Sequence, residues 1–160
     1  MSLAFATAIP SDLRELVALH TAVAARMSTI AGARAWKVPT DRVLLRSMQT
    51  TELVVAREQD ALVATFRLDP ARGFCGVARF TGVPRFDYLL EMAVHPAHVR
   101  RGLGRLCLEE AERRARARGA GAIRLDTNDD GAAAARFYVA CGYVEVLHFA
   151  DTRYFERLLR

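Results

Sequence analysis

Two glycines stand at the start of a strongly helical run, directly behind a pair of arginines. Gly102 and Gly104 follow Arg100 and Arg101, and the helical pattern then extends to Arg118. The first amides of a helix have no partner within it, and the helix dipole favours negative charge beside them. Glycines allow a phosphate to approach this backbone, and arginines add positive charge. The pattern therefore indicates an anion site, although the same glycines would also suit a turn that simply leads into a helix.

Three kinds of phosphate-binding loop compete for this pattern. An ATP-binding loop ends in Gly-Lys-Ser or Gly-Lys-Thr, and the segment has neither ending. A dinucleotide-binding loop is imitated more closely, because a strand at 88–94 precedes the glycines and Asp126 ends the next strand. However, Cys107 stands where the third glycine is expected, and the glycines lie well beyond the strand end. A dinucleotide-binding loop, and with it an oxidoreductase, is thus a distant alternative. The third kind of loop binds acyl-coenzyme A.

The elements that must position this junction follow from the apolar periodicity. Strands are expected at residues 3–8, 52–58, 61–68, 88–94, 122–127, 143–149 and 152–159. Helices are expected at residues 12–27, 40–48, 102–118 and 132–141. Glycine and proline interrupt residues 73–86 too often for an assignment.

The order of these elements predicts the fold class. The strand-helix-strand unit at 88–127 requires a parallel pair of strands, whereas the hairpins on either side require antiparallel pairs. We therefore expect an α/β fold of the α+β type, with a mixed, mostly antiparallel central sheet and helices on both faces. The parallel unit should lie at its centre. The 160 residues contain no repeat or linker, which predicts one domain over residues 1–160.

Composition limits the possible partners. With 52% apolar and 26% charged residues, the chain is typical of a globular protein, and no apolar run approaches the roughly 20 residues of a membrane helix. The net charge is +5, but Lys37 is the only lysine among 23 basic residues. The dominance of arginine and alanine suggests codon bias, so neither nucleic acid nor a membrane is expected as a partner.

The cysteines indicate neither a metal site nor disulfides. Cys75, Cys107 and Cys141 are far apart, and no Cys/His cluster with the spacing of a zinc site is present. Cys107 and Cys141 fall on apolar helix positions and are expected to pack in the core. Since the first residues also lack the pattern of a secretory leader, the sequence predicts a cytoplasmic protein with reduced thiols and no metal.

Two motifs resemble those of the GNAT superfamily of N-acetyltransferases. In that family a strand ending in Val-x-Pro leads through a (Gln/Arg)-x-x-Gly-x-(Gly/Ala) loop into a helix. The corresponding segments here are Val94–Pro96 and Val99–Gly104, with Val99 in place of glutamine or arginine. Residues 134–143, AARFYVACGY, resemble the second motif, A-x-x-(Phe/Tyr)-Tyr-x-x-x-Gly-(Phe/Tyr). Both occur in the correct order.

The resemblance implies acetyl-CoA as the cofactor and assigns residues to it. The main chain of the strand would hydrogen-bond the pantetheine arm, and the loop and helix N-terminus would bind the diphosphate. Asn128 would touch the cofactor from the other side, although an asparagine there also suits a turn. The implied cofactor-binding residues are Met92, Ala93, Val94, Val99, Arg100, Arg101, Gly102, Leu103, Gly104, Arg105 and Asn128.

The resemblance also implies the catalytic groups. Tyr138 matches the family tyrosine that gives a proton or hydrogen bond to the departing sulfur. Glu91 is the carboxylate within the strand before the loop, and we expect it to act as a base or water relay, with Asp87 as the alternative. His20 lies on the apolar stripe of the first helix and is expected to be a packed histidine rather than a base.

The expected activity is acetyl transfer from acetyl-CoA to a primary amine, by direct attack in a ternary complex. The acceptor would be a small molecule or a peptide. An alternative is a non-catalytic sensor or partner module that binds acyl-CoA with a closed acceptor cleft. A homodimer is also possible for such a protein.

Overall fold

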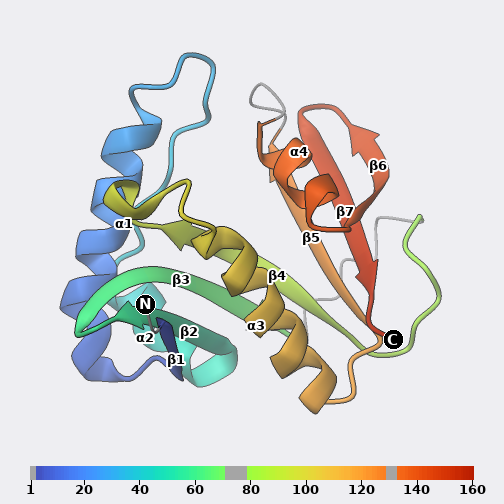
Figure 1. Ribbon diagram of the computed structural model, residues 1–160, viewed down its shortest axis with the longest axis horizontal. Helices are drawn as coiled ribbons and strands as arrows, with labels where there is room; N and C mark the ends of the chain where they lie inside the picture. Colours follow the sequence, from blue (N-terminus) through green and yellow to red (C-terminus); the bar gives the residue numbers. More distant parts are fainter. Residues whose placement is uncertain (1–2, 71–78, 129–132) are drawn as a thin grey trace.

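The computed structural model describes residues 3–70, 79–128 and 133–160 (Figure 1). Its strands are β1 (Leu3–Thr7), β2 (Glu52–Glu58), β3 (Ala61–Asp69), β4 (Phe86–Val94), β5 (Ala122–Asn128), β6 (Val144–Phe149) and β7 (Thr152–Leu158). Its helices are α1 (Leu13–Met27), α2 (Asp41–Thr50), α3 (Leu103–Ala117) and α4 (Ala133–Ala140). Short 3-10 turns, η1 (Pro10–Asp12) and η2 (Pro96–His98), precede α1 and α3.

Each predicted element is present, and its bounds differ from the prediction by a residue or two. The first position predicted for α4, residue 132, lies outside the described residues, as does Cys75. Of the unassigned segment 73–86, the structure describes residues 79–86, and Phe86 already belongs to β4.

The described strands form one mixed sheet in the order β1-β2-β3-β4-β5-β7-β6. The β4–β5 pair is parallel, and the other neighbouring pairs are antiparallel. α3 is the crossover between the two parallel strands. The predicted fold class is therefore confirmed, including the parallel unit at the centre of the sheet.

Helices cover both faces of this sheet, because alternate residues of the strands point to opposite sides. Val54 and Ala56 pack with the α3 residues Cys107 and Leu108 in one apolar core. The intervening strand residue, Val55, contributes to a second core with α1 and α2. Cys141 also lies in the first core, so the predicted core packing of Cys107 and Cys141 is confirmed.

The two parallel strands pair only where they begin. Their register extends from Phe86 opposite Ala122 to Tyr88 opposite Arg124. Beyond this point β4 and β5 diverge, and Figure 1 shows β5, β7, β6 and α4 spreading away from the half of the sheet that carries α1. Among the described residues, no strand therefore pairs with the later part of β4 on its β5 side, which leaves main-chain groups available to a ligand.

β4 also bends where it diverges. Arg67 of β3 pairs with Leu90 and Thr65 pairs with Ala93, so Glu91 and Met92 together stand opposite one residue of β3. This is a β-bulge, and Glu91 adopts a positive φ of 52° there. Such a conformation is unfavourable for a side chain other than glycine or asparagine, and it redirects the side chains that follow.

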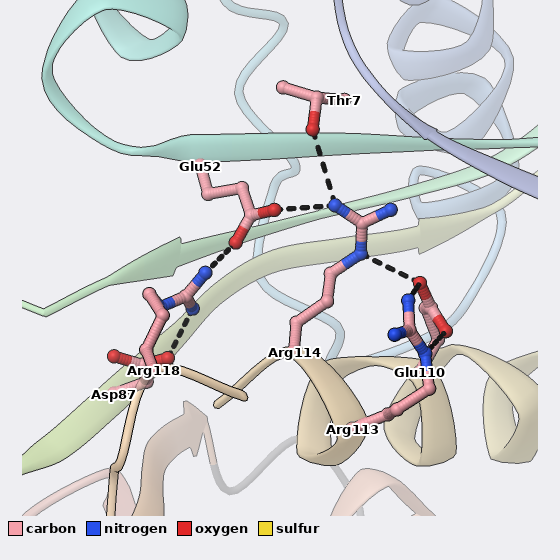
Figure 2. A network of polar contacts seen from close by, with 7 residues as sticks. All are labelled: Thr7, Glu52, Asp87, Glu110, Arg113, Arg114 and Arg118. Carbon is pink, nitrogen blue, oxygen red and sulfur yellow. Dashed lines mark hydrogen bonds and ion pairs between the residues drawn. The ribbon is translucent and has the colours of Figure 1, made fainter. Parts of the chain in front are cut away.

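A network of ion pairs joins the C-terminal half of α3 to the end of the sheet where β2 and β4 begin (Figure 2). Arg114 contacts both Glu52 of β2 and Glu110 of its own helix, the latter at 2.7 Å. Arg118 joins the same Glu52 to Asp87 of β4. These contacts orient α3, and its N-terminal end lies where β4 and β5 diverge.

Candidate active site

The N-terminus of α3 opens into a cavity of about 450 Å³. Gly102 caps the helix with a φ of 81° and with no side-chain hydrogen bond to the first turn. The amide of Leu106 donates to the Gly102 carbonyl at 3.2 Å, so the amides before it have no acceptor within the helix. The cavity walls are Val94, His98, Val99, Arg100, Gly102, Leu103, Gly104, Arg105 and Phe137.

The two glycines of this turn serve different purposes. A β-carbon on Gly102 would meet nothing within 4 Å, so its requirement is the left-handed backbone conformation. A β-carbon on Gly104 would lie 3.0 Å from the ring of Phe137. Gly104 therefore lets α3 approach α4 closely, a packing role that the sequence analysis did not distinguish from access to phosphate.

The three predicted arginines also differ in their surroundings. Arg100 and Arg105 line the cavity, and Arg105 also donates to the carbonyl of Ala140 at 3.1 Å. Arg101 instead forms a two-pronged ion pair with Glu58, with both contacts at 3.0 Å. Two of the arginines thus present positive charge to the cavity, while the third joins this loop to the end of β2.

A second cavity, of about 430 Å³, continues from the first into the space between β4 and β5. Val94 and Val99 line both cavities, so the two cavities adjoin each other. One wall is the predicted segment Met92–Val94 of β4, and the other includes Asn128 of β5 and Tyr138 of α4. Val99 supplies an apolar surface in place of the polar side chain that the motif usually has.

Tyr138 is held in an aromatic cluster at the edge of the second cavity. Its ring lies 5.9 Å from that of Tyr143 and 5.7 Å from that of Phe155. No group in the described part of the chain hydrogen-bonds its hydroxyl. Burial raises the pKa of Tyr138 above its ordinary value near 10. The phenol is consequently protonated at neutral pH and can donate a hydrogen bond to a group in the cavity.

A third cavity, of about 330 Å³, adjoins the second on the side of α1. The two share Arg34, Ala35, Trp36 and Asn128. Glu91 lines the third cavity, where the bulge of β4 directs it, and Arg67 lies 3.2 Å from its carboxylate. The remaining walls include His20 and Lys37.

Asn128 lies where the second and third cavities meet. Its Oδ1 accepts a hydrogen bond from Arg34 at 2.8 Å, which joins the end of β5 to the segment between α1 and α2. This contact spans the divergence of β4 and β5. Asn128 was predicted from its position just after the strand expected at residues 122–127, but its partner 94 residues away could not be predicted.

His20 is the site residue that sequence reasoning placed in the core. It is only 2% exposed, as expected, yet it also borders the third cavity. Trp36 Nε1 donates to His20 Nδ1 at 3.1 Å, with the rings nearly parallel. Since an indole nitrogen only donates, the neutral imidazole must carry its proton on Nε2. A buried histidine needs a hydrogen-bond partner, and a buried tryptophan needs an acceptor for its N–H. The only tryptophan in the chain was therefore the residue from which this contact could have been predicted.

The His20 environment predicts a pH dependence of stability. Burial lowers the pKa of His20 below its ordinary value of 6.5, whereas in the unfolded chain the imidazole takes up a proton near that value. The free energy of unfolding should therefore fall as the pH falls below about 6.5. Replacing His20→Asn keeps an oxygen where Nδ1 stood and should make this slope shallower. Urea unfolding at several pH values measures it.

The matched control for this prediction is His148→Asn. His148 is exposed on β6, so its replacement should leave the slope as in the original protein. An identical slope for His20→Asn and the original protein would contradict the role of buried, neutral His20.

The alternative base, Asp87, lies outside the three cavities. It is near the start of β4, roughly 15 Å along the strand from Met92 at an ordinary rise per residue. Arg118 binds its carboxylate within the network of Figure 2. Asp87 therefore has a structural partner, and Glu91 is the carboxylate that borders the cavities.

Among residues 3–70, 79–128 and 133–160, no group of three or more His, Cys, Asp or Glu side chains could hold a metal ion. No helix in the described part of the chain is long and apolar enough to cross a bilayer.

The diverging parallel strands and the helix N-terminus beside them belong to a fold that solved acetyltransferase structures share. The model of the acetyltransferase (GNAT) family matches residues 21–143, most of the chain. The chain belongs to this family. No curated protein matches it. The family and the mostly antiparallel sheet overturn the dinucleotide-dependent alternative, whose fold requires a mostly parallel sheet.

Solved structures show the same fold at low sequence identity. The PaiA N-acetyltransferase of Thermoplasma acidophilum, in complex with coenzyme A, has a TM-score of 0.77 at 17% identity, covering 99% of both chains. The ribosomal-protein-S18-alanine N-acetyltransferase of Escherichia coli has a TM-score of 0.72 at 16% identity, covering 99% of this chain and 94% of its own. YncA of Salmonella typhimurium, a putative acetyltransferase with its cofactor acetyl-CoA, also reaches 0.72 at 16% identity, covering 100% and 95%.

Proposed function

We propose that the protein is an N-acetyltransferase that transfers an acetyl group from acetyl-CoA to a primary amine in a ternary complex. The observation that carries this proposal is the succession of three adjoining cavities. They extend from the N-terminus of α3, past the part of β4 that diverges from β5, to Glu91 and His20. Two substrates could thus approach each other from opposite ends.

The residues present fit coenzyme A. The free amides of Leu103, Gly104 and Arg105 suit a diphosphate, and the side chains of Arg100 and Arg105 add positive charge. Met92–Val94 line the second cavity, where their main chain would hydrogen-bond the pantetheine arm as an added strand does. The thioester would then lie near Tyr138.

The chain's own groups would assist both halves of the reaction. A main-chain N–H of β4, from Val94 or its neighbour, would stabilise the oxyanion that forms when the amine attacks. Tyr138 would stabilise the departing thiolate. Because burial raises the pKa of this phenol while a thiol has a pKa near 8.5, the hydroxyl keeps its proton and acts as a hydrogen-bond donor.

The amine must lose a proton before or during the attack. Glu91 borders the third cavity and is the carboxylate among its walls. We assign it as the base that accepts this proton, directly or through water. The hydrogen bond from Trp36 keeps the proton of His20 on Nε2, and this N–H would donate a hydrogen bond to the acceptor substrate or to such a water. The need for a base is greatest for a lysine-like amine, with a pKa of about 10.4.

The open third cavity favours an enzyme over an acyl-CoA sensor with a closed acceptor cleft. We expect the acceptor to be a small molecule or peptide with a primary amine, encountered in the cytoplasm, and no nucleic acid or membrane partner. The possible homodimer stays a prediction.

Two measurements test the proposed function. Acetyl-CoA should raise the melting temperature and NADH should not, because the site proposed at the N-terminus of α3 is one for coenzyme A. Thiol release from acetyl-CoA should then increase with some members of a panel of polyamines, aminoglycosides, amino acids and peptides. Stabilisation by NADH alone would overturn the proposal. Binding of acetyl-CoA without any thiol release above background, across the whole panel, would favour the sensor.

A further inference from the structure

The only lysine in the chain lies in the wall of the third cavity, which the proposed function makes the acceptor cavity. Lys37 lines the third cavity together with Glu91, His20 and Trp36. All the other basic side chains are arginines, whose guanidinium stays protonated in proteins and is therefore a poor nucleophile. An amine, by contrast, has an accessible neutral form that can attack a thioester. The one side-chain amine of this protein thus stands where the proposed function places an amine acceptor.

The backbone that carries Lys37 is fixed on both sides. Trp36 is anchored by its hydrogen bond to His20 at 3.1 Å and by the stacking of the two rings. Pro39, which restricts the chain just beyond, belongs to the same cavity wall. The Lys37 side chain is exposed and takes part in none of the ion pairs formed among the described residues. Its ammonium group is therefore not committed to a carboxylate that would hold it away from the cavity.

A lysine side chain is long and flexible. Four methylene groups place Nζ about 6 Å from the α-carbon and allow many rotamers. Trp36, the residue before Lys37, lines both the acceptor cavity and the cavity that contains Tyr138. Because the amine is tethered to the wall, its effective concentration there is on the order of millimolar, without any binding step.

We propose that the protein acetylates itself at Lys37, an inference that rests on the proposed function. Nζ attacks the carbonyl carbon of acetyl-CoA, a C–N bond forms, and the C–S bond breaks. The amine gives up one proton and the departing thiolate takes up one, so the products are ε-N-acetyl-lysine and coenzyme A. Glu91 is the nearby group suited to accept the proton from the amine. No further reactant is needed.

Self-acetylation has a definite stoichiometry and an electrostatic consequence. An amide nitrogen is no longer nucleophilic, so each chain reacts once at this side chain. The reaction also removes a positive charge from the acceptor cavity. In that cavity Arg34 would then be the cationic side chain in the wall, beside the carboxylate of Glu91.

The test incubates the folded, full-length chain with acetyl-CoA and no other amine. Intact-mass spectrometry should show the addition of one acetyl group at Lys37, located by peptide mapping, which also separates it from the α-amine of the chain. The rate should exceed that of the same chain unfolded in urea by about tenfold or more, because only the folded site orients the reactants. It should not change when the protein is diluted, since the amine and the site belong to one molecule.

Two variants sharpen the test. Lys37→Arg keeps the positive charge and should abolish the modification at this position. Arg14→Lys adds a second lysine near the start of α1, outside the three cavities, and this new amine should react no faster than in the unfolded chain. Since both side chains are exposed, neither substitution should disturb folding.

Failure of this inference is distinguishable from failure of the proposed function. If free amines from the panel cause thiol release while Lys37 reacts only at the unfolded rate, self-acetylation is refuted and the enzyme remains. A rate that rises in proportion to protein concentration would also refute it, because transfer would then occur between molecules. If acetyl-CoA neither stabilises the protein nor reacts with any amine, both proposals fall together.

Discussion

Replacing Tyr138→Phe is expected to lower kcat for acetyl transfer by about 100-fold while leaving the KM for acetyl-CoA nearly unchanged. Tyr138 lines the cavity between β4 and β5, and its hydroxyl has no hydrogen-bond partner in the described part of the chain. Its removal therefore takes away a donor needed by the departing thiolate, not a contact that holds the fold. Steady-state measurement of thiol release, with an acceptor from the panel, gives both constants.

Tyr143→Phe is the matched control for this variant. Tyr143 contacts the ring of Tyr138, but its hydroxyl points to Glu112 at 3.5 Å and does not line the cavities. Its loss should change kcat by no more than about twofold. An unchanged kcat in Tyr138→Phe would remove Tyr138 from the mechanism.

The shape of the pH profile provides a second readout for Tyr138. Because burial raises the pKa of Tyr138 above its ordinary value, the phenol stays protonated across the range in which enzymes are usually assayed. The rise of kcat with pH should therefore have the same midpoint in Tyr138→Phe and the original protein, at a lower overall rate. A midpoint that moved on removal of this hydroxyl would instead mean that Tyr138 itself loses a proton during turnover.

Replacing Arg105→Glu should raise the Kd of coenzyme A by about 10- to 100-fold, because it exchanges a positive for a negative charge beside the expected diphosphate. Arg105 lies in the first turn of α3 and lines the first cavity. An acidic side chain at this position suits the helix dipole, so the fold itself should lose little stability. The loss of the hydrogen bond to Ala140 offsets part of this effect. Isothermal titration with coenzyme A measures the change.

Arg14→Glu controls for the change in net charge. Arg14 occupies the first turn of α1, is exposed, and lies outside the three cavities. The Arg14→Glu variant also replaces a positive by a negative charge in the first turn of a helix. It should leave the Kd of coenzyme A within about twofold of the original value at moderate ionic strength. Equal weakening by both variants would show that overall charge, and not the α3 N-terminus, governs binding.

The fold could be predicted from the sequence because its signals are local. Thr40 caps α2 at residue 41, and Gly102 marks the beginning of α3, so capping residues placed these boundaries. The pairing of β4 and β5 as a parallel unit followed from the intervening helix. These features depend on neighbours in sequence, where spacing and residue type carry most of the information.

The bulge in β4 gave no such signal. Positive φ usually falls on glycine or asparagine, but here it falls on Glu91 within YLLEMAV, which contains neither. The bulge depends on how β4 pairs with β3, and Glu91 there lines the third cavity. Glu91 could therefore be predicted as a charged residue in need of a polar environment, but its place opposite α1 could not.

Contacts between distant segments were likewise beyond the sequence. Arg101 and Glu58 are far apart in the chain, and so are Arg34 and Asn128. Arg101 was predicted beside the diphosphate from its neighbours Arg100 and Gly102, yet local spacing does not reveal which side of the loop each arginine occupies. Most residues that line the third cavity come from the segment between α1 and α2, where Trp36 packs on His20.

A crystal structure of the complex with coenzyme A tests the central claim most directly. We predict that the diphosphate oxygens will lie within hydrogen-bond distance of the main-chain amides of Leu103, Gly104 and Arg105. The pantetheine arm should then extend along Met92–Val94 toward Tyr138. Coenzyme A bound at any other position, with the N-terminus of α3 unoccupied, would contradict this account.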